Sequence, residues 1–265
     1  MELIKVVVHG ALGRMGQEVL SAVRGDPQLE VVGATEKSVK QEYLPLPDTS
    51  TLIPYSSNLE YVLNRTHPDV LVDFTTAKAT MSAIHIAVKY RTNLVIGTTG
   101  LSLDDLALID KLSRDNGVGA VVAPNFALGA MMMIHMAKLG AKFFDYAEII
   151  EMHHEKKLDA PSGTALSTAR AMVESRGKPF IYPSQQKEAA SGSRGSEHDG
   201  IAIHSVRMPG LLAHQEVILG GPGQTLSIRH DTINRECYMP GVLLAIKGVG
   251  KFKGLVYGLD KLLGL

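Results

Sequence analysis

The sequence of 265 residues has little of what builds disulfides or membrane spans. It contains one cysteine, Cys237, so no internal disulfide can form, which favours a reducing compartment. No apolar run approaches the roughly 18 residues that a membrane-spanning helix needs. The first residues lead directly into a strand and lack the basic and apolar regions of a signal peptide. We therefore expect a soluble, cytoplasmic protein.

The chain also lacks an excess of either charge. It has 27 Lys and Arg against 27 Asp and Glu, which gives a formal net charge of zero. Without a basic excess, nothing indicates a surface for nucleic acid or for a membrane. Its length allows one large domain or two of moderate size, with a sizeable core. A small molecule is the expected partner.

The beginning of the chain has the order of a dinucleotide-binding βαβ unit. Its parts are a β-branched run at 4–8, the sequence GALGRMG at 10–16, an amphipathic helix to Arg24 and a second strand at 29–34. Glu36 follows at the offset of about 20 residues at which a carboxylate holds the adenosine ribose hydroxyls. Ala11 stands where the usual motif has a glycine, so the loop alone is a weak signal and a simple βα turn is the alternative. The complete unit favours a nicotinamide cofactor.

Two neighbouring residues bear on the kind of cofactor. Glu36 suits a free 2′-hydroxyl, whereas Lys37 can pair with a 2′-phosphate. This pair favours the use of both NADH and NADPH. A solvated lysine next to a strand is the alternative.

Strands and helices continue to alternate as far as Phe126. Strands are expected at 69–74, 93–96 and 120–123, and helices at 79–90 and 102–114, the latter starting with a Ser102–Asp105 capping box. This alternation predicts a doubly wound parallel sheet of the Rossmann type, whose ligands bind at the carboxyl ends of the strands. The loops that follow the strands should therefore gather on one edge. The proline-rich residues 38–57 are expected to be a long connection.

After Phe126 the character of the chain changes. A helix at 128–142 carries a methionine stripe, which is more typical of core or subunit packing than of a ligand site. A polar loop is expected over 184–200. The β-rich runs at 201–206, 215–219 and 225–230, together with 149–152, predict a mixed or antiparallel sheet.

These patterns divide the α/β chain into two domains. Residues 1–126 form the dinucleotide-binding domain, and residues 240–265 are expected to pack back on it. Residues 127–239 form a smaller α+β domain for substrate binding and oligomerisation.

The stretch EMHHEKKLDAPSGT at 151–164 brings the chemistry together. The two histidines fall at the end of a strand, and Ser162 is a natural N-cap for the helix that follows. Free backbone N–H groups at a helix start bind anions. A proton-transfer group, a positive charge and an anion cradle therefore predict a site for a small carboxylate.

Two other chemistries fit this stretch poorly. Adjacent histidines diverge on an extended strand, and no third ligand has a suitable spacing, so we expect no metal at His153 and His154. Ser162 lacks an evident base partner, which argues against a nucleophilic serine.

The sequence HHEKKLDAPSGT at 153–164 resembles the signature of the 4-hydroxy-tetrahydrodipicolinate reductase family, the dihydrodipicolinate reductases of bacterial lysine and diaminopimelate synthesis. The resemblance covers essentially the whole chain and includes GALGRMG at 10–16, DFT at 73–75, GTTG at 97–100 and APNF at 123–126. One departure is Ala127, where many members carry serine.

The resemblance implies a nicotinamide-binding domain, a substrate domain that carries a homotetramer interface, and a hinge. It implies an oxidoreductase that uses NADH or NADPH to reduce a cyclic 2,6-dicarboxylate with loss of the 4-hydroxyl group as water. The implied catalytic residues are His153 and Lys157, and the implied substrate contacts are His154, Ser162, Gly163 and Thr164. The implied cofactor contacts are Gly10, Ala11, Leu12, Gly13, Arg14, Met15, Glu36, Lys37, Gly97, Thr98, Thr99, Ala123, Pro124, Asn125 and Phe126.

Two alternatives share the glycine loop. One is a nicotinamide oxidoreductase acting on an amino acid or semialdehyde, which has no need of the 153–164 signature. The other is a non-catalytic nicotinamide-sensing module, against which His153 and Lys157 argue. The sequence leaves open the preferred coenzyme, tetramer against dimer, the extent of domain closure, and whether the hydroxylated or the dehydrated substrate is bound.

Overall fold

The computed structural model describes residues 2–47, 49–183 and 189–265. By its internal contacts the chain divides into two units. The first unit runs to Ala127 and also includes Arg235–Leu265, and the second is Leu128–Asn234.

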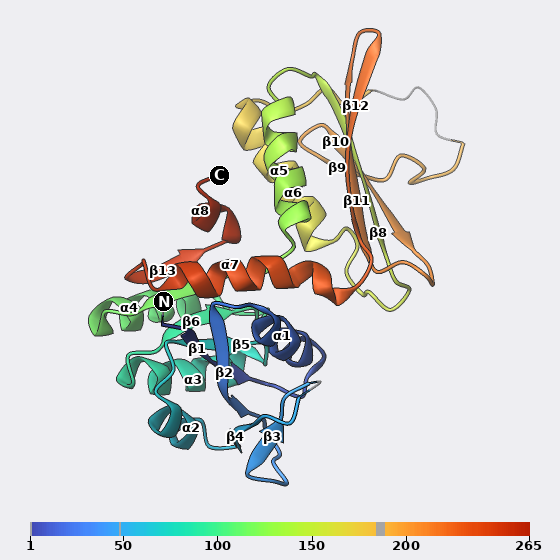
Figure 1. Ribbon diagram of the computed structural model, residues 1–265. Coiled ribbons are helices and arrows are strands. Elements are labelled where there is room, and N and C mark those ends of the chain that lie inside the picture. Colours follow the sequence, from blue (N-terminus) through green and yellow to red (C-terminus); the bar gives the residue numbers. More distant parts are fainter. Residues whose placement is uncertain (1, 48, 184–188) are drawn as a thin grey trace. The chain divides into compact units, whose positions relative to one another are not determined.

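The first unit is built on an eight-stranded sheet (Figure 1). Its strands are β1 (Ile4–His9), β2 (Leu29–Thr35), β3 (Tyr43–Pro45), β4 (Leu52–Ser56), β5 (Val70–Asp73), β6 (Asn93–Ile96), β7 (Gly119–Val122) and β13 (Gly254–Tyr257). They lie in the order β13-β7-β6-β5-β1-β2-β4-β3, and only the β3–β4 pair is antiparallel. Central β1 is apolar through Val6, Val7 and Val8, which are fully buried because helices cover both faces.

Helices cover the two faces of this sheet. They are α1 (Arg14–Gly25), α2 (Leu59–Thr66), α3 (Ala77–Lys89), α4 (Leu103–Asn116), α7 (Met239–Val249) and the short α8 (Leu259–Leu263). Helices α2, α3 and α4 pack on one face, where Leu63, Ile84 and Ile109 join Leu71 and Leu94 of the strands in one core cluster. Helices α1 and α7 contact each other on the other face (Figure 1). The prediction of a doubly wound parallel sheet is confirmed.

Residues 38–57 are not the long connection that their prolines predict. They contain β3 and β4, which extend the sheet beyond β2. Pro45 lies on β3, the short strand at the edge of the sheet, and Pro54 lies in the part of β4 that pairs with β3 and not with β2, so few ladder hydrogen bonds are lost. Ile53 and Tyr55 are buried and hold the edge against the core.

The end of the chain completes the first unit. A 3₁₀ turn, Arg235–Tyr238, precedes α7, and Pro240 lies in the first turn of that helix. A proline is accommodated there because the first helical N–H groups need no partner within the helix. Strand β13 then pairs in parallel with β7.

The second unit has helices on one face of a mixed five-stranded sheet. Its elements are α5 (Leu128–Gly140), β8 (Tyr146–His153), α6 (Gly163–Arg176), β9 (Ser196–His198), β10 (Ile201–Arg207), β11 (Ala213–Gly221) and β12 (Gln224–Thr232). The order is β12-β11-β8-β10-β9, with β8 and β10 parallel and the other pairs antiparallel, as the mixed-sheet prediction requires. Helices α5 and α6 lie side by side (Figure 1) and bury Ile149, Val217 and Met172.

Part of the polar loop predicted over 184–200 is a strand. Residues 184–188 lie outside the described residues, whereas Ser196–His198 forms β9 and pairs with β10. Gly200, with a φ of 85°, makes the turn between them, and a Cβ there would lie 1.9 Å from the carbonyl oxygen of Phe180. The polar composition of this segment predicts a loop, and it gives no sign of a strand of only three residues at the edge of the sheet.

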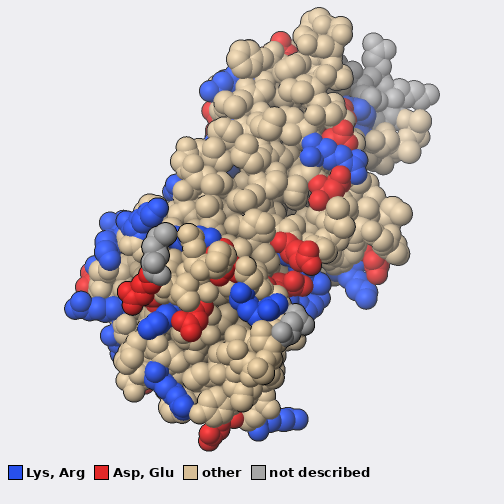
Figure 2. Space-filling model, viewed as in Figure 1, with Lys and Arg blue, Asp and Glu red and all other residues tan. Residues whose placement is uncertain are grey.

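The surface agrees with the balanced composition. Figure 2 shows Lys and Arg interspersed with Asp and Glu on the visible face, with no large area of one sign. Among the described residues, no helix combines the length and the apolar character that crossing a membrane requires.

The start of α4 offers a test of helix capping. The Ser102 hydroxyl accepts from the Asp105 N–H at 3.1 Å, and the Asp105 carboxylate accepts from the Ser102 N–H at 2.8 Å, which confirms the capping box. We expect Ser102→Ala to lower the free energy of unfolding by about 1 kcal/mol, because it removes the hydroxyl that accepts from the Asp105 N–H. Urea unfolding monitored by circular dichroism measures the change.

Ser82→Ala is the matched control, since Ser82 is exposed inside α3 and its hydroxyl donates to the Lys78 carbonyl oxygen. An equal loss in both variants would contradict the capping explanation.

Candidate active site

The predicted cofactor residues lie in the first unit, at the carboxyl ends of neighbouring strands. The glycine loop follows β1, Glu36 follows β2, Gly97–Thr99 follows β6, and Ala123–Phe126 follows β7. Backbone hydrogen bonds join these loops: the Gly10 N–H donates to the Thr35 carbonyl oxygen at 2.9 Å, and the Ala123 N–H donates to that of Ile96 at 3.1 Å. The order of strands reverses between β1 and β5, where ligands of open α/β sheets bind.

The glycine loop brings backbone close to backbone. Gly10 has a φ of 80°, and a Cβ at Gly16 would lie 2.1 Å from the Gly10 carbonyl oxygen. Helix α1 begins at Arg14 after Gly13, whose lack of a side chain leaves the first N–H groups uncovered. This is a cradle for an anionic group, as a pyrophosphate requires. The residues therefore fit a dinucleotide, with Arg14 and Met15 in the first helical turn.

Glu36 reaches back to this loop. Its carboxylate accepts from the Leu12 N–H at 3.1 Å and from the Lys37 N–H at 2.9 Å. It is half-buried, while Lys37 is exposed. The carboxylate predicted to hold the ribose therefore contacts the predicted pyrophosphate loop.

Polar and aromatic contacts connect the remaining cofactor loops. The buried Asp73 carboxylate accepts from the Thr75 hydroxyl at 2.6 Å and from the Thr98 hydroxyl at 3.3 Å. The centroids of the Phe74 and Phe126 rings lie 5.8 Å apart. Gly97 is packed against Phe74 so closely that a Cβ would lie 2.0 Å from its ring. Of the remaining predicted contacts, Thr99, Pro124 and Asn125 lie in these same loops.

The predicted catalytic and substrate residues lie in the second unit, between the end of β8 and the start of α6. His153 is the last residue of β8 and pairs in register with Arg207 of β10. Its Nδ1 lies 2.6 Å from Oε2 of Glu151, which is fully buried. Glu151 also accepts from both terminal nitrogens of Arg207, at 2.8 and 2.7 Å, and from the Ser162 N–H at 3.1 Å.

Burial sets the protonation of this group. It lowers the pKa of His153 below 6.5, and the positive charges of Lys157 and Arg207 act in the same direction, while Glu151 opposes them. Burial alone would raise the pKa of Glu151, but hydrogen bonds from Arg207, Ser205 and His153 outweigh it and hold that pKa below 4.5. At neutral pH the pair is therefore a carboxylate and a mostly uncharged imidazole.

Lys157 and the start of α6 already hold a carboxylate. Lys157 Nζ donates to Asp159 at 2.7 Å, and this bond, with a smaller contribution from the Gly163 N–H, keeps the pKa of Asp159 below 3.8. Ser162 is the N-cap, as predicted, since its hydroxyl accepts from the Ala165 N–H. Thr164 lies in the first turn of the helix, and His154 directly follows β8.

Two residues of this arrangement, Glu151 and Arg207, are absent from the predicted site. A signal for Glu151 was present, because residues two apart on a strand share a face, which places its carboxylate beside His153. No local signal marks Arg207, which lies on another strand and meets Glu151 only through the pairing of β10 with β8.

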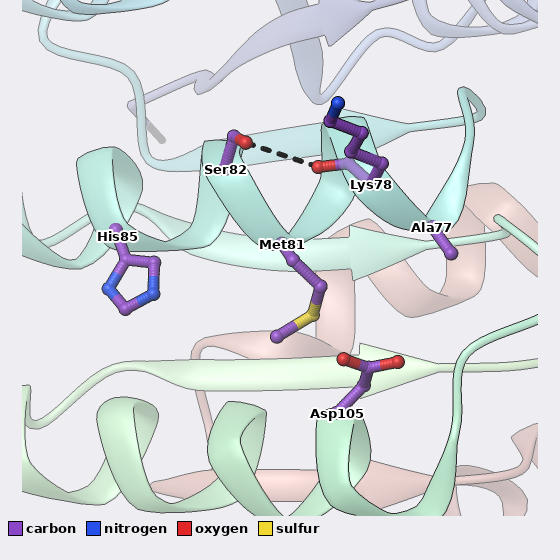
Figure 3. A pocket seen from close by; sticks show the side chains of 6 residues that line it. All are labelled: Ala77, Lys78, Met81, Ser82, His85 and Asp105. Carbon is purple, nitrogen blue, oxygen red and sulfur yellow. Dashed lines mark hydrogen bonds between the residues drawn. The ribbon is translucent and has the colours of Figure 1, made fainter.

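The described residues offer little for a metal or a competing pocket. Among them, no three His, Cys, Asp or Glu side chains gather as a metal ion would require. A shallow pocket lies between α3 and α4, where Met81 points toward Asp105 and Ser82 is hydrogen-bonded to Lys78 (Figure 3). No residue of the predicted site lines it, and Asp105 is already engaged by Ser102.

A doubly wound sheet with this glycine loop, joined in one chain to a buried histidine–carboxylate pair close to a helix N-terminus, is typical of the class of nicotinamide-dependent oxidoreductases. Family models narrow the class: "Dihydrodipicolinate reductase, N-terminus" matches residues 4–126, and "Dihydrodipicolinate reductase, C-terminus" matches residues 129–263. The chain belongs to the dihydrodipicolinate reductase family.

Individual relatives are similar to this chain over nearly their full length. A 4-hydroxy-tetrahydrodipicolinate reductase of Dehalococcoides mccartyi is 58% identical over 100% of both chains. That of Bacillus subtilis is 44% identical, over 99% of this chain and 98% of the relative. The solved structure of a dipicolinate-bound dihydrodipicolinate reductase from Paenisporosarcina sp. TG-14 is similar with a TM-score of 0.87 and 41% identity, covering 98% of this chain and 99% of that one.

The environment of His153 predicts its titration. We expect its pKa to lie below 6.5, with the proton of the neutral ring on Nδ1, because burial disfavours the imidazolium and Glu151 accepts from Nδ1. Since the folded state then binds this proton more weakly than the unfolded chain, the group lowers stability as the pH falls below 6.5. Long-range ¹⁵N–¹H spectra of histidine-labelled protein report both properties.

The His153→Gln variant assigns the signal. A titration midpoint of His153 at or above pH 6.5 would contradict the expectation that burial outweighs the effect of Glu151 on its pKa.

Proposed function

We propose that this chain reduces (2S,4S)-4-hydroxy-2,3,4,5-tetrahydrodipicolinate to tetrahydrodipicolinate with loss of water, using NADH or NADPH. The observation that carries the proposal is the buried Glu151–His153 pair beside Lys157 and an α-helix N-terminus, in a chain of the dihydrodipicolinate reductase family. The reaction belongs to lysine and diaminopimelate biosynthesis.

The two units divide the work in this proposal. The first unit is the dinucleotide-binding domain, in which residues 10–15, Glu36, Lys37, Gly97–Thr99 and Ala123–Phe126 hold the cofactor. The second unit is the substrate-binding domain, in which His154, Ser162, Gly163 and Thr164 contact the substrate. The cradle at Gly10 and Gly16 supports the first role, and the anion-holding start of α6 supports the second.

Loss of the 4-hydroxyl group and a neighbouring proton as water leaves a conjugated ene-imine, and when bound, NADH or NADPH would supply the hydride that this ring accepts at C4. The electron-rich ring that results must be protonated at C3, and His153 is the proposed donor. Because its Nδ1 is engaged by Glu151, Nε2 is the nitrogen that carries the transferred proton. The lowered pKa of His153 makes its imidazolium a readier donor, although less of it is present at neutral pH.

Lys157 and the helix N-terminus are proposed to hold the two carboxylates of the substrate. Lys157 neutralises one carboxylate and stabilises negative charge that develops on the ring. The N–H groups of Gly163 and Thr164 hold the other. Asp159, which is bonded to Lys157 and interacts with Gly163, supports this role because it is itself a carboxylate at these donors.

The reaction is tested directly with the freshly made product of the preceding synthase. We expect rapid oxidation of NADH, followed at 340 nm. The rate measured in parallel with NADPH shows which coenzyme the pair Glu36 and Lys37 favours. Protein that binds NADH but oxidises none of it would contradict the proposed substrate. Oxidation with an amino acid or semialdehyde instead would assign the chain to another reaction of the same class.

Lys157 gives a sharper test of the assigned roles. We expect Lys157→Ala to lose turnover, by about a hundredfold or more, because an electrostatic group near the reacting ring is removed. NADH affinity, measured by fluorescence titration, should stay near that of the wild type. Lys156→Ala is the control, because Lys156 is exposed beside it. Lost NADH binding in Lys157→Ala would place this lysine at the cofactor instead.

We also propose that the enzyme works as a homotetramer in the cytoplasm. Helices cover one face of the second unit's sheet, while Ile150, Met152 and Ile218 alternate onto the other face and are only half-buried in the single chain. Met132 and Met136 of α5 are exposed as well. Such apolar surface supports subunit packing.

A further inference from the structure

The carboxylate behind His153 is built into the interior of the second unit. Glu151 is fully buried, and the side chains of His153 and Arg207 are only 15% and 18% exposed. Oε1 accepts from Arg207 and the Ser162 N–H, whereas Oε2 accepts from Arg207 and faces His153 Nδ1. We propose that Glu151 and Arg207 are positioning residues, which fix the proton of neutral His153 on Nδ1 and thereby present Nε2 to the substrate. This inference rests on the proposed role of His153 as proton donor.

The direction of the hydrogen bond follows from the donors around Glu151. An ionised carboxylate can only accept, so His153 Nδ1 must donate to it in both the neutral and the charged ring. Proton transfer from Nε2 then leaves the bond to Glu151 intact, and no rearrangement is needed between turnovers. A histidine without this partner can place its proton on either nitrogen.

Arg207 connects the pair to the loop that carries Lys157. Its Nη2 donates to the Asp159 carbonyl oxygen at 2.7 Å, and its Nη1 donates to that of Val206 at 2.8 Å. One guanidinium therefore holds both the Glu151 carboxylate and the loop at Asp159. A planar fork of donors suits this task in a way that a lysine does not.

The charged groups that act on His153 are Glu151, Lys157 and Arg207. Glu151 favours the imidazolium, and the other two disfavour it. Replacing Glu151 by an uncharged residue should therefore lower the pKa of His153, and replacing Arg207 by an uncharged residue should raise it. A general loss of structure would not produce this pair of opposite changes.

The decisive variant is Glu151→Gln. An amide NH₂ at the Oε1 position would face two N–H donors, from Arg207 and Ser162, whereas at the Oε2 position it faces one N–H donor and the ring nitrogen. The Ser205 hydroxyl, which also contacts Glu151, can donate or accept and therefore opposes neither orientation. The amide therefore turns its NH₂ toward Nδ1, which must now accept, and the neutral ring carries its proton on Nε2. We expect this tautomer in long-range ¹⁵N–¹H spectra, a pKa lower by about one unit or more, and kcat lower by about 10²-fold to 10⁴-fold.

Arg207→Met supplies the second measurement if Glu151→Gln folds poorly. It removes a positive charge, so the pKa of His153 should rise by about one unit while Nδ1 stays protonated. Glu148→Gln is the matched control. Glu148 lies on β8 three residues earlier, faces the other side of the sheet and is likewise held by an arginine and a histidine, Arg194 and His204. Its replacement should leave the tautomer, the pKa and kcat unchanged, provided that gel filtration shows the same assembly.

The outcomes separate the two proposals. An unchanged tautomer and an unchanged pKa in Glu151→Gln would overturn the positioning role and leave the proposed function standing. The altered tautomer with wild-type kcat, together with full turnover in His153→Gln, would overturn the assignment of His153 as the donor and the positioning role with it. The altered tautomer with lost turnover in both variants would establish the inference.

Discussion

The second unit depends on the burial of one carboxylate. A charge removed from water is destabilising unless ion pairs and hydrogen bonds compensate for it. Glu151 meets this condition because Arg207, Ser162 and His153 all donate to it. These partners come from β10, from the start of α6 and from the end of β8, so the requirement also fixes where the three elements meet. The position of His153 is thus fixed by the packing of the core.

The first unit satisfies a different constraint, the close approach of backbone to backbone. Gly10, Gly16 and Gly97 occupy places where a Cβ would lie within 2.7 Å of a neighbouring atom. Their small size lets the loops after β1, β5 and β6 pack against one another and leaves the N-terminus of α1 open. Both units therefore offer a helix start to an anion, one through α1 and one through α6. A dinucleotide and a diacid both suit such sites.

Electrostatics explains why His153 is paired at all. Burial near Lys157 and Arg207 disfavours an imidazolium, and without a counter-charge the ring would rarely be a proton donor at neutral pH. Glu151 offsets part of this effect and leaves a histidine that gives up its proton readily. Lys157 forms an ion pair with Asp159 close by. The balance of these charges suits proton transfer to a dianionic ring.

The sequence by itself determined the alternation of strands and helices, the glycine loop with Glu36, and the run from His153 to Thr164. These features depend on local periodicity, capping and turn chemistry, which act between residues close in the chain. The roles of the individual site residues came from resemblance and stay predictions. Tertiary structure alone decided the short strands β3, β4 and β9, whose polar or proline-containing segments are stabilised by pairing with neighbouring strands of their sheets. It also decided the contact of Arg207 with Glu151, because only the register of β10 on β8 brings two residues so far apart in sequence to one hydrogen-bonded pair.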